Sequence, residues 1–241
     1  MTFEADLFAG KTAIVTGGTT GIGAGTALIL ARLGARVLAL GFDAHKLQVP
    51  EGLDLRAMEV DVTNASAIEA AMGEVDRLDI LVNCAGIIRR AEEHEIDVFE
   101  KVIDVNLNGT LRCCRLARAK LAESGGVIIN TASMLSFFGG GLVPAYSASK
   151  GGVMQLTKSL AIAYAADGIR VNAVAPGWIA TPLTEALQKD PKRADPILQR
   201  TPLGRWGLPD DIAQAVVFLC SPAASFITGT ILPVDGGYLV A

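Results

Sequence analysis

A tyrosine and a lysine, Tyr146 and Lys150, stand four residues apart in the run Tyr-Ser-Ala-Ser-Lys, so that on a helix they would share one face. A phenol has a pKa of about 10 and is a poor base at neutral pH. An ammonium group about 4 Å away is worth about 4 kcal/mol at an effective dielectric constant of about 20, which would bring that pKa close to neutral pH. Taken alone, such a pair is more often an ordinary half-exposed pair on a helix. With Ser133 just past an apolar run thirteen residues earlier, the pattern favours general acid–base chemistry on a hydroxyl or carbonyl group.

A glycine-rich turn lies near the start of the chain, between an apolar run and a helical pattern. Its glycines allow a sharp turn and a close approach to a phosphate, while the start of the next helix offers free amides and a positive dipole end. Glycine-rich turns also occur for purely structural reasons, but the position between strand and helix favours a nucleotide site. The residues expected to contact the nucleotide here are Gly17, Thr19, Thr20, Gly21, Ile22 and Gly23.

Short apolar runs alternate with helical patterns along the chain, which is typical of βαβ units with a parallel sheet. The runs are continuous in Val, Ile, Leu and Ala, as expected for strands covered on both faces. The predicted strands are Thr12–Val15, Arg36–Leu40, Leu55–Val60, Ile80–Val82, Gly126–Thr131, Arg170–Ala175 and Ile231–Val234.

The predicted helices are Gly21–Leu33, Ala65–Glu74, Ile96–Leu121, Tyr146–Ala166 and Asp210–Leu219, and the third is expected to be two helices broken near Asn106. The segment Thr181–Gly207 contains four prolines and interrupts this rhythm. Long insertions in compact domains tend to be functional, and we interpret this one as a helical flap over the substrate. The sequence predicts an α/β fold, a single domain over residues 1–241 with a doubly wound parallel sheet and helices on both faces.

Composition excludes several classes of function. A net charge of −4 provides no electrostatic footprint for nucleic acid, and no apolar run is long enough for a membrane span. The four cysteines (Cys84, Cys113, Cys114 and Cys220) form no CxxC pair, so reduced thiols in a cytoplasmic protein are expected and no metal site is predicted. A serine hydrolase is excluded because the chain has only two histidines, no G-x-S-x-G motif and no evident histidine partner for Ser133.

The spacing Gly-xxx-Gly-x-Gly resembles the short-chain dehydrogenase/reductase family, and further motifs continue the resemblance in the family's order along nearly the whole chain. It implies a catalytic set of Asn106, Ser133, Tyr146 and Lys150. Ser133 would hydrogen-bond the substrate oxygen, Lys150 would also hold the nicotinamide ribose, and Asn106 would support a water relay to it. The run Asn83-Cys84-Ala85-Gly86 is similar to a family motif, with Cys84 in place of its second asparagine. The other cofactor contacts implied by the family are Asp61, Val62, Asn83, Ala85, Gly86, Pro176, Gly177, Ile179 and Thr181. Family members are typically homotetramers, which implies the same assembly here.

The cofactor preference depends on the residues after the second strand, where an acid favours NAD and basic residues favour NADP. Asp43 lies twenty residues beyond Gly23, close to the expected distance, although it comes two positions after the strand end and could instead cap a turn. No arginine occupies the glycine-rich turn, where NADP-using relatives often carry one. NAD is therefore the expected cofactor and NADP is not excluded. The segment from Gly41 to Leu55 is short and contains Pro50, so the usual helix there is expected to be abbreviated.

The substrate is predicted from weaker signals. Met134, Leu135, Val143 and Trp178, with Phe137 and Leu183, could line a partly apolar pocket, or several could be core residues. The run Gly86-Ile87-Ile88-Arg89-Arg90 resembles relatives that act on gluconate-type sugar acids, and Arg89 could hold a carboxylate, although a solvated surface pair is the alternative. We therefore expect a dehydrogenase acting on a sugar, sugar acid or polyol. A 3-oxoacyl thioester reductase and a catalytically silent nucleotide-binding scaffold or sensor are the alternatives.

Overall fold

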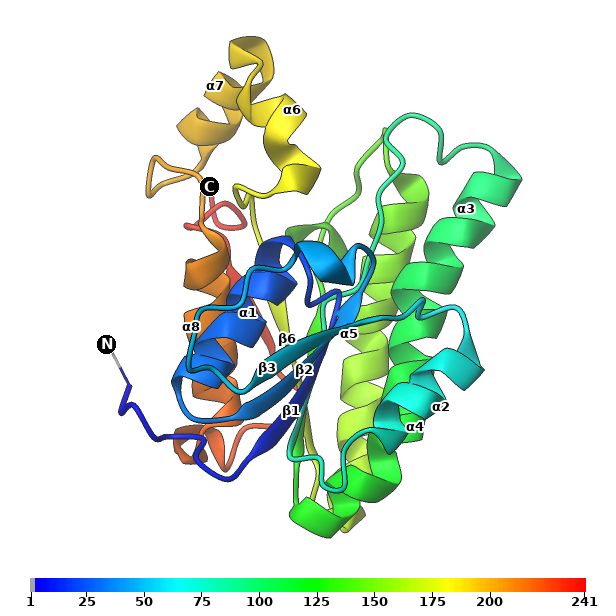
Figure 1. Ribbon diagram of the computed structural model, residues 1–241. Coiled ribbons are helices and arrows are strands. Elements are labelled where there is room, and N and C mark those ends of the chain that lie inside the picture. Colours follow the sequence, from blue (N-terminus) through cyan, green and yellow to red (C-terminus); the bar gives the residue numbers. More distant parts are fainter. Residues whose placement is uncertain (1–2) are drawn as a thin grey trace.

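Seven short apolar segments form the parallel strands of one sheet in the computed structural model, which describes residues 3–241 (Figure 1). The order across the sheet is β3-β2-β1-β4-β5-β6-β7. The strands are β1 (Thr12–Thr16), β2 (Arg36–Gly41), β3 (Leu55–Glu59), β4 (Ile80–Asn83), β5 (Val127–Thr131), β6 (Arg170–Pro176) and β7 (Ile231–Val234). The predicted α/β fold with a doubly wound parallel sheet is confirmed, and each strand agrees with its predicted range to within one residue at either end.

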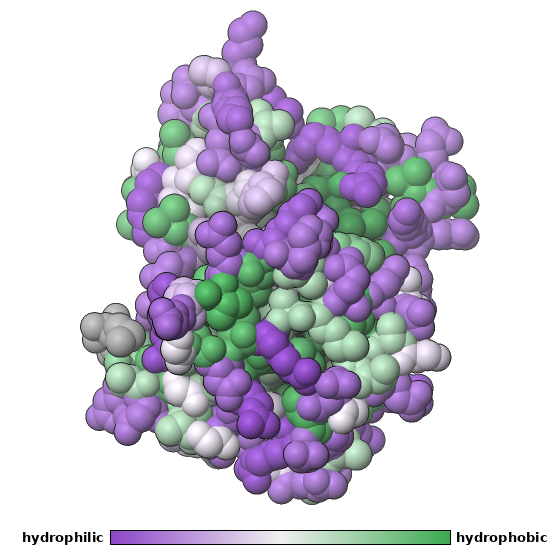
Figure 2. All heavy atoms as spheres, in the orientation of Figure 1, coloured by the Kyte–Doolittle hydropathy of each residue, from purple (hydrophilic) through white to green (hydrophobic). Residues whose placement is uncertain are grey.

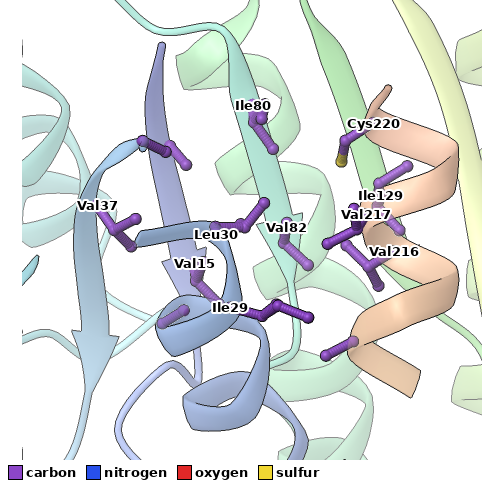
Figure 3. Packing of buried hydrophobic residues seen from close by; sticks show 14 of the residues in the cluster. Val15, Ile29, Leu30, Val37, Ile80, Val82, Ile129, Val216, Val217 and Cys220 are labelled. Carbon is purple, nitrogen blue, oxygen red and sulfur yellow. The ribbon is translucent and has the colours of Figure 1, made fainter. Parts of the chain in front are cut away.

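Helices cover both faces of the sheet because successive residues of each strand point to opposite sides. Ala13 and Val15 of β1 pack in one core cluster and Ile14 between them packs in the other. The first cluster joins the sheet to α1 (Gly21–Arg32) and α8 (Pro209–Cys220), as Figure 3 shows. The second joins it to α2 (Ala65–Gly73), α4 (Gly109–Ser124) and α5 (Pro144–Tyr164).

The predicted break near Asn106 is a different feature in the structure. The chain runs from α3 (Ile96–Ile103) through a π-helical turn at Asp104–Asn108 directly into α4. A π turn inserts one extra residue without ending the helix, and such turns occur frequently at functional sites. The helix is therefore widened rather than broken, and Asn106 at the centre of the turn is fully buried.

The insertion after β6 forms two short helices, α6 (Glu185–Gln188) and α7 (Pro191–Arg200), which rise above the carboxyl ends of the strands (Figure 1). The order of the strands reverses between β1 and β4, and ligands of such sheets bind outside the carboxyl ends at this point. Between β2 and β3 there is only a single 3₁₀ turn at Ala44–Lys46, so the expected abbreviation of a helix there is confirmed. In the part of the chain that the structure describes, no helix is both long and apolar enough to cross a membrane.

Candidate active site

Tyr146 and Ser133 meet at the wall of a cavity of about 350 Å³. Tyr146 lies in the first turn of α5, and Ser133 follows the end of β5. The roof of the cavity includes Leu187 of α6 and Arg193 of α7. In Figure 2, hydrophobic atoms show in the recess between the lobe of α6 and α7 and the end of α3, whereas the lobe itself is mostly hydrophilic.

Lys150 lies one helical turn after Tyr146, with its side chain almost out of contact with water. The residue is 4 % exposed, and its Nζ donates a hydrogen bond to the carbonyl oxygen of Thr131 at 2.6 Å. The Nζ is 5.6 Å from the centre of the Tyr146 ring. Burial lowers the pKa of Lys150 from the usual 10.5 to about 8, although the nearby Cys84 acts in the opposite direction. The ammonium form still predominates at neutral pH.

The expected lowering of the Tyr146 pKa is not found in the protein alone. Burial raises the pKa of this phenol, a hydrogen bond with Ser133 opposes the rise, and the charge of Glu93 adds to it. The reason is that Lys150 makes its hydrogen bond to a backbone carbonyl rather than to the phenol oxygen, while the surroundings disfavour the phenolate. Tyr146 is therefore a protonated acid until a further positive charge is brought near it.

The side chain of Asn106 ties the π turn to its neighbours. Its Oδ1 accepts from the N–H of Ile87 at 2.8 Å, and its Nδ2 donates to the carbonyl of Ile87 at 2.9 Å and to Ser149 Oγ at 3.1 Å. The sequence analysis expected Asn106 to support a water relay and did not predict these three hydrogen bonds. These bonds hold the loop after β4 against α5, one residue before Lys150.

Ser133 is held by a second serine that the sequence analysis did not single out. Ser136 Oγ accepts from the N–H of Ser133 at 3.2 Å and donates to the carbonyl of Lys150 at 2.7 Å. The Ser133 Oγ accepts from the N–H of Leu135 at 3.1 Å. The loop after β5 is thereby joined to the helix that carries Tyr146.

The glycine-rich turn fits the phosphates of a dinucleotide. Gly17 has a φ of +61°, and a Cβ there would lie 2.7 Å from the backbone nitrogen of Ala85. A Cβ at Gly23 would lie only 2.1 Å from the carbonyl oxygen of Gly17. Helix α1 begins at Gly21 with no side-chain hydrogen bond at its cap residue, Thr20, and no acid in its first turn. Its first amides are thus left for an anion.

The remaining predicted cofactor residues fall into two groups. Ile22, Pro176, Gly177, Ile179 and Thr181 line the cavity with Tyr146, and a Cβ at Gly86 would lie 3.7 Å from Lys150 Nζ. The others hold local structure. The buried Asn83 donates to Asn130 Oδ1 at 2.9 Å, Ala85 donates through its N–H to Thr16 Oγ1 at 3.3 Å, and Thr19 Oγ1 donates to the carbonyl of Phe42 at 2.8 Å. Asp61 accepts from the N–H and the hydroxyl of Thr63, both at 2.8 Å, and Val62 is 6 % exposed and lies against Gly109.

Asp43 lies beyond the end of β2, on the surface. Its φ of +54° turns the chain into the 3₁₀ segment, and its carboxylate forms a salt bridge with Lys46 at 3.0 Å. Glu59 at the end of β3 accepts from the N–H groups of Asp43 and Ala44 at 3.2 and 3.0 Å. Two carboxylates and one ammonium therefore surround this end of the site.

Some of the predicted substrate residues line the cavity and others lie outside it. Met134, Leu135 and Trp178 line the cavity, as does Leu183. Val143 is not among the lining residues and is 3 % exposed, because it is a core residue directly before α5. Arg89 also lies outside: it is exposed, and its guanidinium donates to the carbonyl of Ile88. The next residue, Arg90, lines the cavity instead, together with Arg193.

Glu93 is a buried carboxylate that the sequence analysis missed. It has no exposed surface, and its two oxygens accept from the N–H groups of Arg89 and Tyr146, each at 2.8 Å. A carboxylate is favoured in the first turn of a helix, where amides are unpaired and the dipole is positive. Glu93 thus caps α5 from a distant loop. The sequence could not single out Glu93, because Glu92 and Glu95 beside it are the same residue type. Only the structure shows that these two are exposed and Glu93 is buried.

Comparisons with known proteins show what the whole chain is similar to. A family model described as enoyl-(acyl carrier protein) reductase matches residues 17–239. A 2-dehydro-3-deoxy-D-gluconate 5-dehydrogenase of Bacillus subtilis is 45% identical over 241 residues, covering 95% of both chains. A cis-4-hydroxycyclohexanecarboxylate dehydrogenase of Sinomonas cyclohexanicum is 42% identical, covering 97% of this chain and 98% of its own. A crystal structure of a candidate 2-deoxy-D-gluconate 3-dehydrogenase from Agrobacterium tumefaciens with bound NADP has a TM-score of 0.92 at 42% identity, over 99% of this chain and 100% of its own.

Proposed function

Because this chain belongs to the short-chain dehydrogenase/reductase family, we propose that it is an NAD(P)-dependent oxidoreductase that interconverts a secondary alcohol and a ketone on a sugar acid. One observation carries the proposal: Tyr146, Ser133 and Ile22, the second residue of the uncapped helix α1, line the same cavity. A proton-transferring phenol next to a phosphate-binding turn is the arrangement that such an oxidoreductase needs.

The cofactor is a nicotinamide dinucleotide, which accepts or supplies the hydride when it is bound. Gly17, Gly21 and Gly23 would hold its pyrophosphate at the start of α1, and Ile179 and Thr181 would line the nicotinamide end. NAD is preferred over NADP because Asp43 and Glu59 outnumber Lys46 at the expected position of the adenosine ribose, which disfavours a further phosphate. The Agrobacterium relative, which holds NADP, keeps the other choice open to experiment.

Tyr146 transfers the proton in this proposal. Its raised pKa keeps the phenol protonated, which is the form that donates a proton to the substrate oxygen in ketone reduction. Ser133 would hydrogen-bond the same oxygen. For alcohol oxidation Tyr146 must become a phenolate, and the positive charge of a bound nicotinamide ring would favour that form together with Lys150 one turn away.

The other two residues act through position. Asn106 holds the loop of Ile87 against α5, and Lys150 would also bind the nicotinamide ribose. The segment 181–207 would act as the flap over the substrate, within a chain that works as one domain. These assignments make Tyr146, Ser133, Lys150 and Asn106 the catalytic and positioning set.

The substrate class is supported by two relatives that act on hydroxy acids, as their names state. In both names the reacting carbon is δ to the carboxylate, although one substrate is a sugar acid and the other a ring. The proposed substrate is therefore a δ-hydroxy or δ-keto acid, because both relatives act on such a carbon and because two arginines line the cavity. The family model is described by an acyl-carrier-protein substrate, and among acyl thioesters the ones that suit alcohol–ketone chemistry are 3-oxoacyl thioesters, so a 3-oxoacyl thioester reductase is the second candidate.

A panel of substrates with both cofactors tests the proposal. We expect NADH formation from sugar acids such as D-gluconate and 2-dehydro-3-deoxy-D-gluconate, and the catalytic efficiency should be higher with NAD than with NADP. Turnover of 3-oxoacyl thioesters alone would establish the second candidate. Dinucleotide binding without turnover of any alcohol or ketone would instead indicate a scaffold or sensor. A preference for NADP of about tenfold, or about 1.4 kcal/mol, would overturn the cofactor choice.

We also propose a homotetramer in the cytoplasm. Large apolar side chains are exposed on the two long helices, at Leu111 of α4 and Ile162 of α5, and before β7 at Phe226. In the proposed assembly these side chains would lie at the interfaces between subunits. The four cysteines are all free, which suits a reducing compartment.

A further inference from the structure

We propose that Arg90 and Arg193 together form the carboxylate-binding site of the active-site cavity, one on the loop after β4 and the other on α7. The inference rests on the proposed function and deepens it. In this inference the two guanidinium groups bind the substrate's carboxylate, away from the reacting carbon. The enzyme would therefore prefer hydroxy acids to neutral polyols. It also assigns carboxylate binding to Arg90 instead of Arg89, which the sequence analysis had predicted.

Two positive charges face this cavity without a salt-bridge partner. Arg90 and Arg193 both line it, and within residues 3–241 neither forms a salt bridge with an acidic side chain. Burial lowers the pKa of Arg90, and the charge of Arg193 lowers it further, which means that the two cations repel each other. Glu93 acts in the opposite direction, but both of its oxygens already accept backbone N–H groups. An anion between the two arginines would relieve the repulsion.

The loop that carries Arg90 is held in one conformation. Ala91, the next residue, has a φ of +70°, which an alanine adopts only at a cost. Its N–H donates to the carbonyl of Leu142 at 2.8 Å, and the N–H of Arg89 donates to Glu93 Oε1, also at 2.8 Å. These contacts fix the backbone on both sides of Arg90. A strained and firmly held residue next to a cavity is typical of a functional site.

Arg193 lies at an unusual place for a cation. It occupies the first turn of α7, where the positive end of the helix dipole disfavours a positive side chain and favours a bound anion. Because α7 belongs to the flap, a carboxylate held by both arginines would join the flap to the fixed loop.

Within residues 3–241, no other lysine or arginine lines this cavity. Ile22, Ile88, Met134, Leu135 and Leu187 are apolar and cannot stabilise a charge. Tyr146 and Ser133 are assigned to the reacting oxygen. A guanidinium presents paired N–H donors that match the two oxygens of a carboxylate. The cavity therefore offers a hydroxyl site at Tyr146 and Ser133 and a cationic site at Arg90 and Arg193, the two kinds of partner that a hydroxy acid requires.

The experiment compares D-gluconate with D-glucitol, which has a neutral hydroxymethyl group in place of the carboxylate. Arg90→Gln and Arg193→Gln should each raise the KM for gluconate at least about tenfold and change kcat by less than about threefold. The efficiency for glucitol should change by less than about twofold. The double variant should lose less than the product of the two single losses, because both arginines hold one carboxylate.

Two matched variants control for loss of charge and for folding. Arg89→Gln removes a charge from the neighbouring residue outside the cavity, and Lys192→Gln removes one from the same turn of α7. Both should leave the KM for gluconate within about twofold of the unmodified enzyme. Equal losses for gluconate and glucitol in Arg90→Gln, or an Arg89→Gln effect as large as that of Arg90→Gln, would overturn the proposal.

A binding measurement separates this inference from the proposed function. Tryptophan fluorescence, from Trp178 in the cavity wall and Trp206 packed against it, can report gluconate binding to Tyr146→Phe protein saturated with NAD even if no turnover is found. Binding that disappears in both arginine variants and not in the controls supports the acid site. Unchanged binding in both variants, or inorganic phosphate displacing gluconate at lower concentrations than gluconate itself requires, would contradict a carboxylate site.

Discussion

At the scale of single residues, the proposed active site combines charged forms that its surroundings disfavour. Lys150 keeps a buried ammonium that forms no salt bridge with any acid of the described chain. Its pKa falls from 10.5 to about 8, so keeping it charged at neutral pH costs the folded state about 3 kcal/mol. Burial also disfavours the charged form of Tyr146, the phenolate, and therefore raises the pKa of this residue. Function here is expected to oppose stability.

Replacing Lys150 by methionine should show this opposition directly. Lys150→Met removes the buried charge and loses one hydrogen bond to Thr131, so the free energy of unfolding should rise by about 2 kcal/mol at neutral pH while turnover disappears. The lysine destabilises the fold fully below its folded pKa of about 8 and less and less towards its unfolded value of 10.5. The gain should therefore shrink as the pH rises from about 8. Urea unfolding at several pH values measures it, and a variant less stable than the unmodified protein at neutral pH would contradict the argument.

Glu93 provides a second prediction at this scale, because its charge raises the pKa of Tyr146 and its oxygens cap α5. In Glu93→Gln the amide nitrogen cannot accept a hydrogen bond, so stability should fall by about 1–3 kcal/mol. Loss of the negative charge should also lower the Tyr146 pKa and move the acid limb of the pH profile for alcohol oxidation to lower pH. The exposed neighbour offers a control, Glu92→Gln, which should move neither. An unchanged pH profile together with a lower free energy of unfolding would mean that Glu93 only caps α5.

At the scale of elements, the first βα unit depends on close contact between backbones. Gly23 opens α1 directly against the carbonyl of Gly17, and Gly17 itself lies against the loop after β4. No side chain fits at either position. The π turn at Asp104–Asn108 has a comparable role, since it places Asn106 where it can bind the same loop after β4.

Two glycine-to-alanine variants separate this close contact from ordinary helix propensity. Gly23→Ala would place a Cβ 2.1 Å from a carbonyl oxygen, so it should weaken NAD binding at least about tenfold and lower stability by more than about 2 kcal/mol. Gly73→Ala at the end of α2 meets nothing within 4 Å and should stabilise the protein by about 0.5 kcal/mol. Thermal unfolding and NAD titration measure both, and a Gly23→Ala protein that binds NAD normally would exclude the proposed phosphate site.

At the scale of the whole molecule, the layered sheet could be predicted because it depends on local patterns. Strands covered on both faces are continuously apolar, and the spacing of Tyr146 and Lys150 puts them on one face of any helix. The remaining features depend on tertiary structure. Arg90 rather than Arg89 lines the cavity, next to the left-handed turn at Ala91, and burial decides the direction of the Tyr146 pKa. Neither is visible in the order of residues.

Assembly provides the prediction at this scale. Ile162 of α5 is 81% exposed, and an aspartate there would place a charge in the interface proposed between long helices. Ile162→Asp should therefore convert the tetramer into dimers without changing the unfolding transition of the subunit by more than about 0.5 kcal/mol. Sedimentation velocity measures the change, and a monomer in the unmodified protein would contradict the proposed assembly.

The most direct test of the central claim, that Tyr146 transfers the proton, is the turnover of Tyr146→Phe beside its affinity for NAD. The variant removes one oxygen atom, so turnover should fall by about a thousandfold or more while NAD binds within about threefold of the unmodified enzyme. Tyr164→Phe, which removes a phenol from the other end of the same helix, should keep its activity within about twofold. Turnover by Tyr146→Phe close to that of the unmodified enzyme would contradict the account.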